Sequence, residues 1–336
     1  MLHLQEAGTI LYGRYRVTEL VARGGMGAVY RAEDLRLPGR ECALKEILLY
    51  GEADEDADEA REQFYREASV LARLDHPNLP KVSDYFSEGG RDYLVMDFVP
   101  GPSLQELVDE ANAAGVHLPE EQVLQWARQL CNALEYLHGQ EPPILHRDIK
   151  PANIRLTAAG VVKLVDFGLV KLLRPEETRT ITVVHGRGTA PYTPFEQYGG
   201  DSQHTDQRSD IYALGATLYH LLTGQPPPSA RERFLRPGCL APPQELNPRL
   251  SSRVDRAVLW AMAMHPEARP RNVAEFRAAL LGEKPLPEAH FRALDPVEAM
   301  VAGSPWQESW FAALQANLPL IGLVLALLAL AVHLSA

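Results

Sequence analysis

Short apolar runs recur through the first hundred positions, and one of them alternates with polar residues, which is the pattern of β-strands. The alternation around a glycine cluster predicts a hairpin over residues 15–30, and an apolar run predicts another strand over 41–49. Two more strands are expected within 79–99. One amphipathic helix, over residues 59–74, interrupts this series. Its apolar positions recur at helical spacing and are Phe64, Ala68, Leu71 and Leu74.

After Pro100 and Gly101 the apolar period lengthens to that of helices. A long helix is expected over 120–138 and a fully buried one over 211–222. Two further helices are expected over 254–264 and 273–281, with short strands near Ile144, Ile154 and Val162. The proline-rich residues 225–250 predict irregular structure with at most one short helix. The pattern therefore places strands first and helices second.

The end of the chain has a different pattern, because every residue from Leu318 to Val332 is apolar, proline or glycine. A helix that spans a membrane needs roughly 20 apolar residues. We predict such a helix over 318–334, preceded by a linker over 282–317. Trp306, Trp310 and Phe311 lie where an aromatic belt is expected. A buried or surface-docking helix is the alternative.

Composition narrows the function classes. The net charge of -11 provides no basic field for nucleic acid. Six of the carboxylates fall within 52–59, which we interpret as a solvated loop leading into a helix. The three cysteines, Cys42, Cys131 and Cys239, form no CxxC pair, so they predict neither a zinc site nor a disulfide framework. They indicate a reducing, cytosolic compartment for the bulk of the chain.

The candidate chemistry is concentrated in the segment His-Arg-Asp-Ile-Lys-Pro-Ala-Asn over residues 146–153, followed by Asp-Phe-Gly over 166–168. The first segment resembles the catalytic loop of eukaryotic-type protein kinases, and the second resembles their magnesium-binding loop. A charged surface loop is the alternative for either segment alone. Together and in this order they favour phosphoryl transfer.

The resemblance extends over about residues 13–281 and is to the bacterial serine/threonine kinases of the eukaryotic (Hanks) type. It implies an α+β fold with two lobes, a strand-rich N-lobe over 13–98 and a helical C-lobe over 99–281, with residues 1–12 as an extension. It also implies that ATP and Mg²⁺ bind between the lobes and that serine or threonine hydroxyls of proteins are the substrates.

The resemblance assigns the nucleotide contacts to the glycine-rich hairpin, the Lys45 strand and the segment joining the lobes. Ala22 replaces the usual first glycine of the hairpin. Glu67 stands where the family carries the ionic partner of Lys45. The implied nucleotide-binding residues are Val21, Gly24, Gly25, Gly27, Val29, Ala43, Lys45, Met96, Asp97, Val99 and Arg155.

The same resemblance implies that Asp148 is the catalytic base and that Lys150 neutralises charge on the transferred phosphoryl group. Asn153 and Asp166 are the implied Mg²⁺ ligands, since this cation prefers oxygen. Arg155 departs from the family, which usually has an apolar residue at or beside this place, under the adenine ring. Arg155 either covers the ring with its aliphatic stem or stacks on it through its guanidinium group; the alternative is that Leu156 does the packing and Arg155 is a solvated strand residue.

Four further positions resemble the supports of a kinase active site. Glu196 and Arg269 are the expected buried ion pair, and Asp210 is the expected anchor of the catalytic loop, with an N-cap role as its alternative. Either Thr189 or Thr193 should contact the catalytic loop, and the spacing from Glu196 favours Thr193.

Arg147 is expected to receive a phosphate on the activation segment, where Thr178, Thr180 and Thr182 are the candidates for autophosphorylation. The complete prediction is a single-pass, membrane-tethered Ser/Thr protein kinase with its kinase domain in the cytoplasm. A homodimer is left open. The rival interpretations are a pseudokinase that acts as a nucleotide-binding scaffold, toward which Ala22 and Arg155 lean, and a kinase of small molecules.

Overall fold

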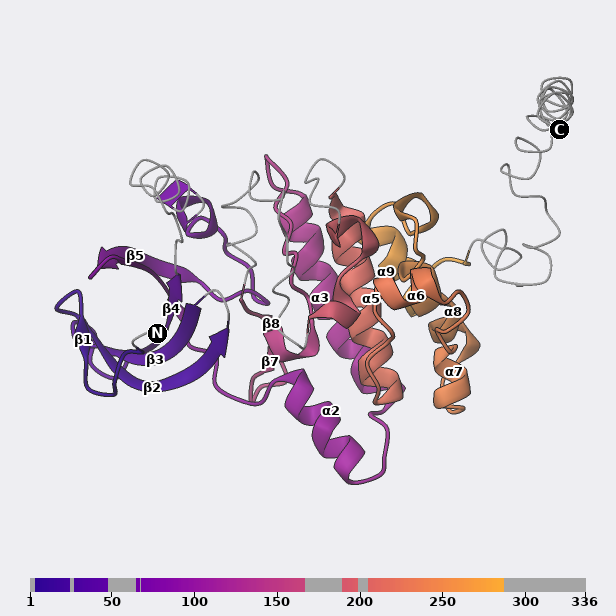
Figure 1. The fold of residues 1–336 in the computed structure, drawn as a ribbon, viewed down its shortest axis with the longest axis horizontal. Coiled ribbons are helices and arrows are strands. Elements are labelled where there is room, and N and C mark those ends of the chain that lie inside the picture. The colour runs from indigo at the N-terminus through magenta and orange to yellow at the C-terminus, as the bar shows by residue number, and fades with distance from the viewer. Residues whose placement is uncertain are drawn as a thin grey trace, which may run out of the picture. The chain divides into compact units, whose positions relative to one another are not determined.

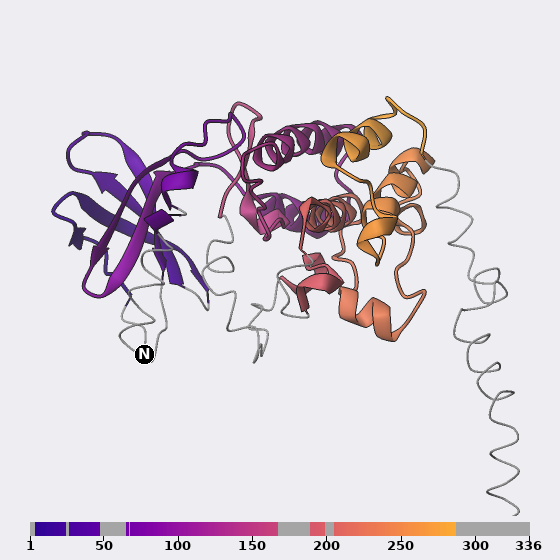
Figure 2. The same ribbon diagram turned by 90° about the horizontal axis from the view of Figure 1, so that it is seen from above.

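The computed structural model describes residues 4–24, 27–47, 65–66, 68–166, 189–198 and 205–286. All of them belong to one compact unit that ends at Leu286. Within this unit a curled sheet is followed by a group of helices (Figure 1). The view from above separates the same two lobes (Figure 2). The bilobal α+β arrangement predicted from the sequence is therefore confirmed.

The first lobe is built on a six-stranded antiparallel sheet with the order β1-β2-β3-β4-β6-β5. The expected hairpin is β2 and β3, the expected third strand is β4, and the expected pair within 79–99 is β5 and β6. The strands are β1 (Ile10–Leu11), β2 (Tyr15–Gly24), β3 (Gly27–Asp34), β4 (Glu41–Ile47), β5 (Val82–Glu88) and β6 (Arg91–Asp97).

Both faces of this sheet are buried in its middle, which explains the unbroken apolar run in β6. One face packs into an aromatic-rich cluster that includes Tyr15, Tyr30 and Phe86. The other face, through Ala43 and Met96, belongs to a core that continues into the helical lobe. The sheet is thus held to the second lobe by shared apolar packing.

The N-terminal residues contact this sheet. The backbone N–H of Gln5 donates to the Tyr30 hydroxyl at 3.2 Å, and its side-chain amide donates to the Tyr93 hydroxyl at 2.9 Å. Strand β1 pairs with β2. Much of the segment expected to be an extension before residue 13 therefore packs as part of the first lobe.

The helix expected over 59–74 is described only in part. Residues 65–66 and 68–71 are helical, and Ala68, Leu71 and Leu74 are buried as predicted. Phe64 lies outside the described residues.

The second lobe is mainly helical, with a two-stranded sheet, β7 (Ile154–Leu156) and β8 (Val162–Leu164), at its junction with the first lobe. Helix α5 lies in the middle and is buried over most of its length, which explains its apolar sequence. The helices are α2 (Leu104–Ala113), α3 (Glu120–His138), α5 (Gln207–Thr223), α6 (Ala230–Leu235), α7 (Pro243–Leu246), α8 (Ser252–Ala261) and α9 (Val273–Leu281). Short 3-10 turns are η1 (Pro151–Asn153), η3 (Ala190–Tyr192), η4 (Phe195–Tyr198) and η6 (Pro266–Ala268).

Three sequence predictions for this lobe were wrong or incomplete. No strand forms around Ile144, because residues 143–150 are irregular. The proline-rich segment holds two short helices, α6 and α7, instead of at most one. Helix α2 was missed, although Ser103 and Glu106 form a capping box at its start that the Ser-x-x-Glu spacing signals.

Among the helices that the structure describes, none is both long enough and apolar enough to cross a membrane. The helix predicted over 318–334 lies outside the described residues, as does the linker from residue 287 onward.

Candidate active site

The segment that carries the candidate base follows α3 in the chain. Its backbone is held in place by Asp210 of α5. The carboxylate of Asp210 accepts the backbone N–H groups of His146 and Arg147, each at 2.9 Å. A ring nitrogen of His138 lies 2.9 Å from the same carboxylate. Burial alone would raise the pKa of Asp210, but these hydrogen bonds outweigh it and hold the pKa below its usual value.

This geometry confirms that Asp210 anchors the backbone of residues 146 and 147, and it excludes the N-cap role for Asp210. The N-cap of α5 is Asp206, whose side chain accepts the backbone N–H of Arg208. Asp210 instead fixes a backbone in which Arg147 has a φ of 64°, a left-handed conformation that is rare for a residue with a side chain. The fixed backbone aims the next residue, Asp148.

Asp148, Lys150 and Asn153 form one hydrogen-bonded cluster. The Nζ of Lys150 donates to Oδ2 of Asp148 at 2.9 Å. The side-chain nitrogen of Asn153 donates to the same Oδ2 and to the backbone carbonyl of Asp148, both at 2.9 Å. The η1 turn, with Pro151 at its start, brings Asn153 back toward Asp148. The structure thus brings together three predicted site residues.

Thr189 adds a fourth side chain to this cluster through Lys150. Its hydroxyl oxygen accepts a hydrogen bond from Nζ of Lys150 at 3.0 Å. Thr193 is buried, and its hydroxyl donates to the backbone carbonyl of Thr189 at 3.2 Å. The preference for Thr193 was therefore wrong: Thr189 contacts the catalytic loop, and Thr193 supports Thr189.

Lys45 and Asp166 meet between the two lobes. The ammonium group of Lys45, on β4, forms an ion pair with the carboxylate of Asp166. Asp166 follows β8 with a φ of 64°, and the preceding residue, Val165, donates its N–H to the carbonyl of Asn153 at 2.8 Å. The Lys45–Asp166 pair is therefore adjacent to the Asp148 cluster. Glu67, the predicted partner of Lys45, lies outside the described residues.

Asn153 and Asp166 have the chemistry that a magnesium site requires. The amide nitrogen of Asn153 is used by Asp148, which leaves its oxygen as the atom available to a cation. Asp166 adds a partly exposed carboxylate. In the part of the chain that the structure describes, no cluster of three or more His, Cys, Asp or Glu side chains could hold a metal. Two oxygen ligands fit Mg²⁺, which usually completes its shell with water and substrate phosphates.

The glycine-rich hairpin is closed at its tip by a pair of glycines, Gly24 and Gly27, that face each other across β2 and β3. Gly27 has a φ of +146°, and a Cβ there would lie 1.9 Å from the carbonyl oxygen of Glu46. Only glycine fits this close approach of β3 to β4. Val29, two positions on, lies opposite Lys45 in the sheet register. Gly25 lies outside the described residues, and Val21 and Ala22 are exposed on β2.

The remaining residues predicted to contact the nucleotide lie on strands β4 and β6 and on the connection to α2. Ala43 and Met96 are buried neighbours on paired strands. Asp97 ends β6 and donates its N–H to the carbonyl of Lys81 at 3.0 Å, and Val99 is buried just beyond it. These residues connect the sheet to the helical lobe.

Arg155 lies on β7, bridged to Ser103 at the start of α2. Its Nη1 is 3.8 Å from Oε2 of Glu106. Leu156 packs against the core and donates its N–H to the carbonyl of Pro102 at 2.8 Å. The guanidinium of Arg155 is thus drawn toward α2, while Leu156 contributes apolar packing.

The end of the activation segment is held by the predicted ion pair. Glu196 and Arg269 make a two-point contact, with distances of 2.7 Å and 3.0 Å between their nitrogen and oxygen atoms. The Ser209 hydroxyl also donates to Glu196 at 2.8 Å. Both charged side chains are buried, so the pair is architectural, as expected.

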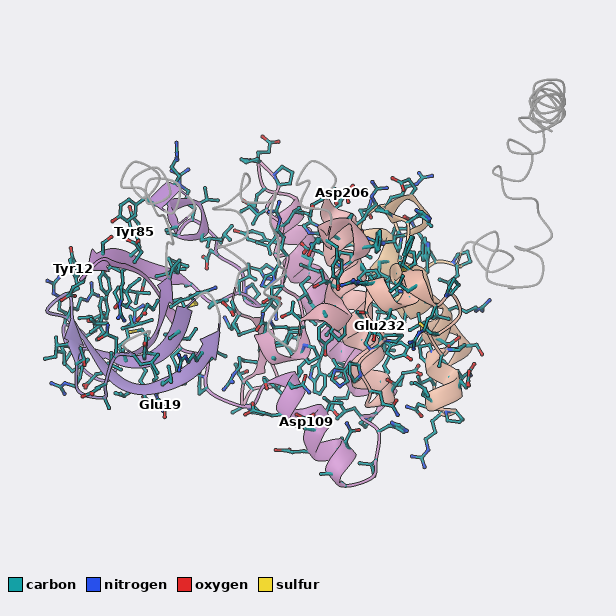
Figure 3. All side chains as sticks on the ribbon, viewed as in Figure 1. Tyr12, Glu19, Tyr85, Asp109, Asp206 and Glu232 are labelled. Carbon is teal, nitrogen blue, oxygen red and sulfur yellow. The ribbon has the colours of Figure 1, made fainter. Side chains whose placement is uncertain are left out.

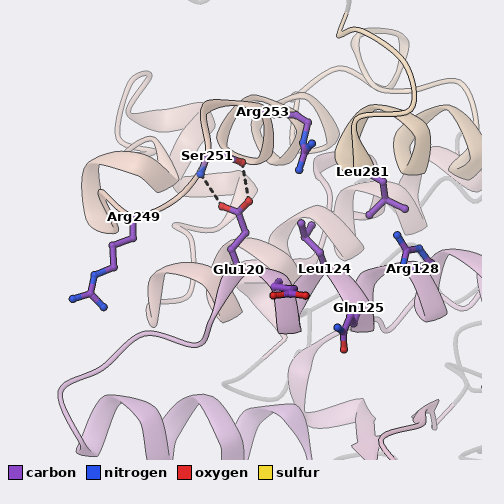
Figure 4. Close-up of a pocket in the computed structure, with 9 residues that line it drawn as sticks. Glu120, Leu124, Gln125, Arg128, Arg249, Ser251, Arg253 and Leu281 are labelled. Carbon is purple, nitrogen blue, oxygen red and sulfur yellow. Dashed lines mark hydrogen bonds between the residues drawn. The ribbon is translucent and has the colours of Figure 1, made fainter.

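A separate cavity of about 590 Å³ lies on the helical lobe (Figure 4). It is lined by residues at the starts of α3 and α8 and at the end of α9. Glu120 there accepts hydrogen bonds from the backbone N–H and hydroxyl of Ser251. None of its lining residues belongs to the Asp148 cluster.

Comparison with known proteins agrees with this geometry. Residues 15–241 match the family described as the protein kinase domain, and the chain belongs to this family. A Mycobacterium leprae protein, "Serine/threonine-protein kinase PknB", is 35% identical over 288 residues, covering 81% of this chain and 43% of that protein. A Deinococcus radiodurans protein, "DNA damage-responsive serine/threonine-protein kinase RqkA", is 37% identical over 276 residues, covering 80% of this chain and 39% of that protein.

Among solved structures, "PpkA-294 apo form" superposes with a TM-score of 0.68 at 28% identity, covering 82% of this chain and 99% of that one. The matches confirm the prediction of a bacterial Hanks-type kinase. The chain spans less than half of the length of the two curated relatives named above.

Proposed function

We propose that this chain is a serine/threonine protein kinase that transfers the γ-phosphoryl group of ATP, with Mg²⁺, to hydroxyl groups of protein substrates. The observation that carries the proposal is the single cluster formed by Asp148, Lys150, Asn153 and Thr189 next to the Lys45–Asp166 pair. Lys150 and the activation-segment ending at Glu196 favour a protein substrate over a small molecule.

Each residue has a defined part in this proposal. Mg-ATP, when bound, supplies the phosphoryl group and metal charge near its leaving oxygen. Asp148 orients the substrate hydroxyl and accepts its proton. Lys150, held between Asp148 and Thr189, keeps a positive charge beside the acceptor. Asn153 and Asp166 hold the cation through oxygen atoms.

Lys45 and the glycine-rich hairpin position the nucleotide. In the described contacts Lys45 pairs with Asp166, and we propose that it also pairs with Glu67, which directs its ammonium group toward the phosphates. Arg155, whose backbone is bridged to Ser103, is the proposed floor of the adenine site. The pseudokinase alternative gains no support, since Lys45, Asp148, Asn153 and Asp166 are all present.

Transfer of phosphate tests the proposal. The full chain, purified in detergent, should label itself and dephosphorylated β-casein when incubated with radiolabelled ATP and magnesium. Asp148→Asn should lower the rate by about a thousandfold or more, because the general base and its charge are lost together. Lys45→Ala should bind ATP more weakly. Nucleotide binding without transfer to any protein would contradict the proposal and favour a pseudokinase.

We also propose that residues 318–334 form a membrane-spanning helix that tethers the kinase domain on the cytoplasmic side. The uniformly apolar sequence and the aromatic residues before it support this, and ATP is available in the cytoplasm. The full chain should sediment with membranes and resist extraction by carbonate, whereas a chain ending at Gly303 should stay in the supernatant. Sedimentation of both would contradict the tether.

The candidate phosphorylation sites Thr178, Thr180 and Thr182 lie outside the described residues. We propose that at least one of them is autophosphorylated and then pairs with Arg147, ordering the segment. Phosphopeptide mapping of the active chain should find phosphate there, and the Asp148→Asn variant should lack it. Absence of phosphate from all three in the active chain would overturn this part.

A further inference from the structure

The cavity of about 590 Å³ on the helical lobe combines arginine side chains with apolar ones. Arg128 of α3, Arg249 of the loop before α8 and Arg253 of α8 line it, together with Leu124 of α3 and Leu281, the last residue of α9. In Figure 4 the side chain of Arg253 points from α8 toward Leu124. We call this space the α3–α8 cavity. Its volume is typical of sites for small molecules, and its lining is both cationic and apolar.

The arginines of the α3–α8 cavity differ from others on the same lobe in having no carboxylate partner. Arg208 of α5 pairs with Asp206, which is labelled in Figure 3, at 2.7 Å, and Arg277 of α9 pairs with Glu135 at 3.1 Å. None of the three guanidinium groups in the cavity has an ion-pair or hydrogen-bond partner among the described residues. Unpaired cations gathered in one concave site attract an anion.

Arg253 is the best placed of these cations. Its Nε atom is buried and has no hydrogen-bond partner in the part of the chain that the structure describes. The absence of a side chain at Gly282 leaves room for its guanidinium group, since a Cβ there would lie 2.4 Å from Nη1. A buried N–H donor without an acceptor is destabilising, and an oxyanion bound in the cavity would satisfy this donor with a strong, charge-assisted hydrogen bond.

Two carboxylates also line the cavity, and they restrict which anion fits. Glu120 accepts hydrogen bonds from the backbone N–H and the hydroxyl of Ser251 at 2.7 Å and 2.8 Å, so it holds the loop before α8 in place. Figure 4 shows Glu120 between Arg249 and the other two arginines. Glu121 is exposed and can accept a hydrogen bond from a hydroxyl group. Three cations and two carboxylates leave one positive charge, which suits a single phosphate with a hydroxyl group beside it.

The ends of two helices add to the positive potential of the cavity. Helix α3 begins at Glu120 without a side-chain cap, and α8 begins directly after Ser251. The N–H groups of a first helical turn and the helix dipole both favour an anion. This contribution reinforces the arginines, which provide the full charges.

We propose that the α3–α8 cavity binds a phosphate ester that carries a free hydroxyl group, which is the chemistry of glycerol phosphate. The phosphate contacts Arg253 and Arg128, the hydroxyl donates to Glu121, and the carbon chain packs on Leu124 and Leu281. This inference goes beyond the proposed kinase function and does not depend on it.

This chemistry has two sources, the headgroup of an anionic phospholipid and a soluble polyol phosphate. The lipid is the expected source, for two reasons. The apolar residues Leu124 and Leu281 give the cavity a surface for the carbon chain next to the phosphate. The chain also continues from Leu281 toward the apolar residues 318–332, which form the proposed membrane tether.

Isothermal titration calorimetry on the full chain in a nonionic detergent tests the proposal. The probes are glycerol 1-phosphate, dihexanoyl-phosphatidylglycerol and dihexanoyl-phosphatidylcholine, whose headgroup has a balancing cation and no hydroxyl. A non-hydrolysable ATP analogue with magnesium is present at saturation, so that the candidate active site is filled. The first two probes should bind saturably and the third should not. Tighter binding of phosphatidylglycerol than of glycerol 1-phosphate identifies the lipid as the source, and equal affinities identify a soluble polyol phosphate.

Substitutions in the cavity should weaken this binding. Arg253→Met removes the guanidinium group and keeps an apolar stem, and Arg128→Gln removes a second, exposed cation. Each should weaken the binding of glycerol 1-phosphate about 10- to 100-fold, because charge-assisted hydrogen bonds are lost. Glu121→Ala should abolish the preference for glycerol 1-phosphate over inorganic phosphate. The matched control is Arg256→Gln, which replaces an exposed arginine of α8 outside the cavity and should leave binding unchanged.

All four variants should keep the thermal midpoint of the unchanged chain and its rate of casein phosphorylation, because none of the replaced residues belongs to the Asp148 cluster. Three results would overturn the inference. The first is the absence of saturable binding of both hydroxyl-bearing esters. The second is an equal loss of binding in Arg256→Gln and Arg253→Met. The third is inorganic phosphate that binds the unchanged chain as tightly as glycerol 1-phosphate. Failure of the unchanged chain to transfer phosphate would contradict the proposed kinase function and would leave this inference standing.

Discussion

At the scale of single residues, the two similar threonines Thr189 and Thr193 have different roles, because their hydroxyl groups have different partners. Thr189 immediately precedes the η3 turn, and its hydroxyl oxygen accepts a hydrogen bond from Lys150. Thr193 follows that turn, and its hydroxyl points back to the carbonyl of Thr189. Both are threonines near the end of the activation segment, so only their place relative to the turn gives them different roles.

Thr189→Val should therefore impair catalysis more than Thr193→Val. Valine has nearly the shape of threonine but offers no acceptor to Lys150, and a hydrogen bond to a charged group contributes about 1.5–3 kcal/mol. We expect kcat to fall about 10- to 100-fold, measured with dephosphorylated β-casein. Thr189→Ser should retain most of the activity. A larger loss of kcat in Thr193→Val would contradict the assignment.

At the scale of elements, the pairing of β3 with β4 connects the glycine-rich hairpin to the strand that carries Lys45. Gly27 lies so close to Glu46 that the two strands cannot keep their register if a side chain is added. Glu46 is itself fixed, because its buried carboxylate accepts hydrogen bonds from Arg91 at 3.0 Å and from Tyr30 at 3.2 Å. The backbone next to Lys45 is therefore held from both sides.

Gly27→Ala should separate the strands beside Lys45 and raise KM for ATP. We expect a loss of about 3 kcal/mol in the free energy of unfolding, since a backbone clash adds to the cost of an unfavourable φ. The matched control is Gly89→Ala, because Gly89 also has a positive φ of 59° but would place its Cβ in open space. The control should cost about 1–2 kcal/mol and leave KM for ATP unchanged. Equal effects on KM in both variants would rule out the clash as the cause.

At the scale of the whole molecule, two kinds of contact hold the lobes and the active site together. Apolar packing continues from Ala43 and Met96 of the sheet into the helical core. Polar anchors then fix the irregular segments that carry the chemistry. Asp210 is the central anchor, since it joins α3, the catalytic loop and α5. The stability of the lobe should therefore depend on the ionisation of this one carboxylate.

Asp210→Asn should lower the free energy of unfolding by about 3 kcal/mol near neutral pH, because buried N–H groups lose a charged acceptor. The folded-state pKa of Asp210 is below its unfolded value of 3.8. The contribution of ionised Asp210 to the free energy of unfolding is therefore fully present above about pH 4. It is lost as the pH falls through the folded-state pKa of Asp210. Urea unfolding of both chains between about pH 6 and about pH 3 should show the difference shrinking as the pH falls. A constant difference would mean that the charge of Asp210 is not the cause.

The sequence by itself determined that strands precede helices along the chain. It also identified Asp148, Lys150 and Asn153 as candidate site residues. Helical and strand periods are local properties, and the catalytic loop is one contiguous segment, so both can be recognised without knowing how the chain folds. The same holds for the capping boxes of α2 and α6, whose Ser-x-x-Glu spacing was present in the sequence but was not used.

The tertiary structure alone decided which groups meet across the fold. It selected Thr189 over Thr193, packed residues 4–11 onto the sheet, and left Phe195, Phe234 and Leu235 exposed together. Each of these depends on residues far apart in the chain, or on which face of a short helix is turned toward the core. A period in the sequence specifies that an apolar face exists, whereas packing against neighbouring elements decides whether that face is buried.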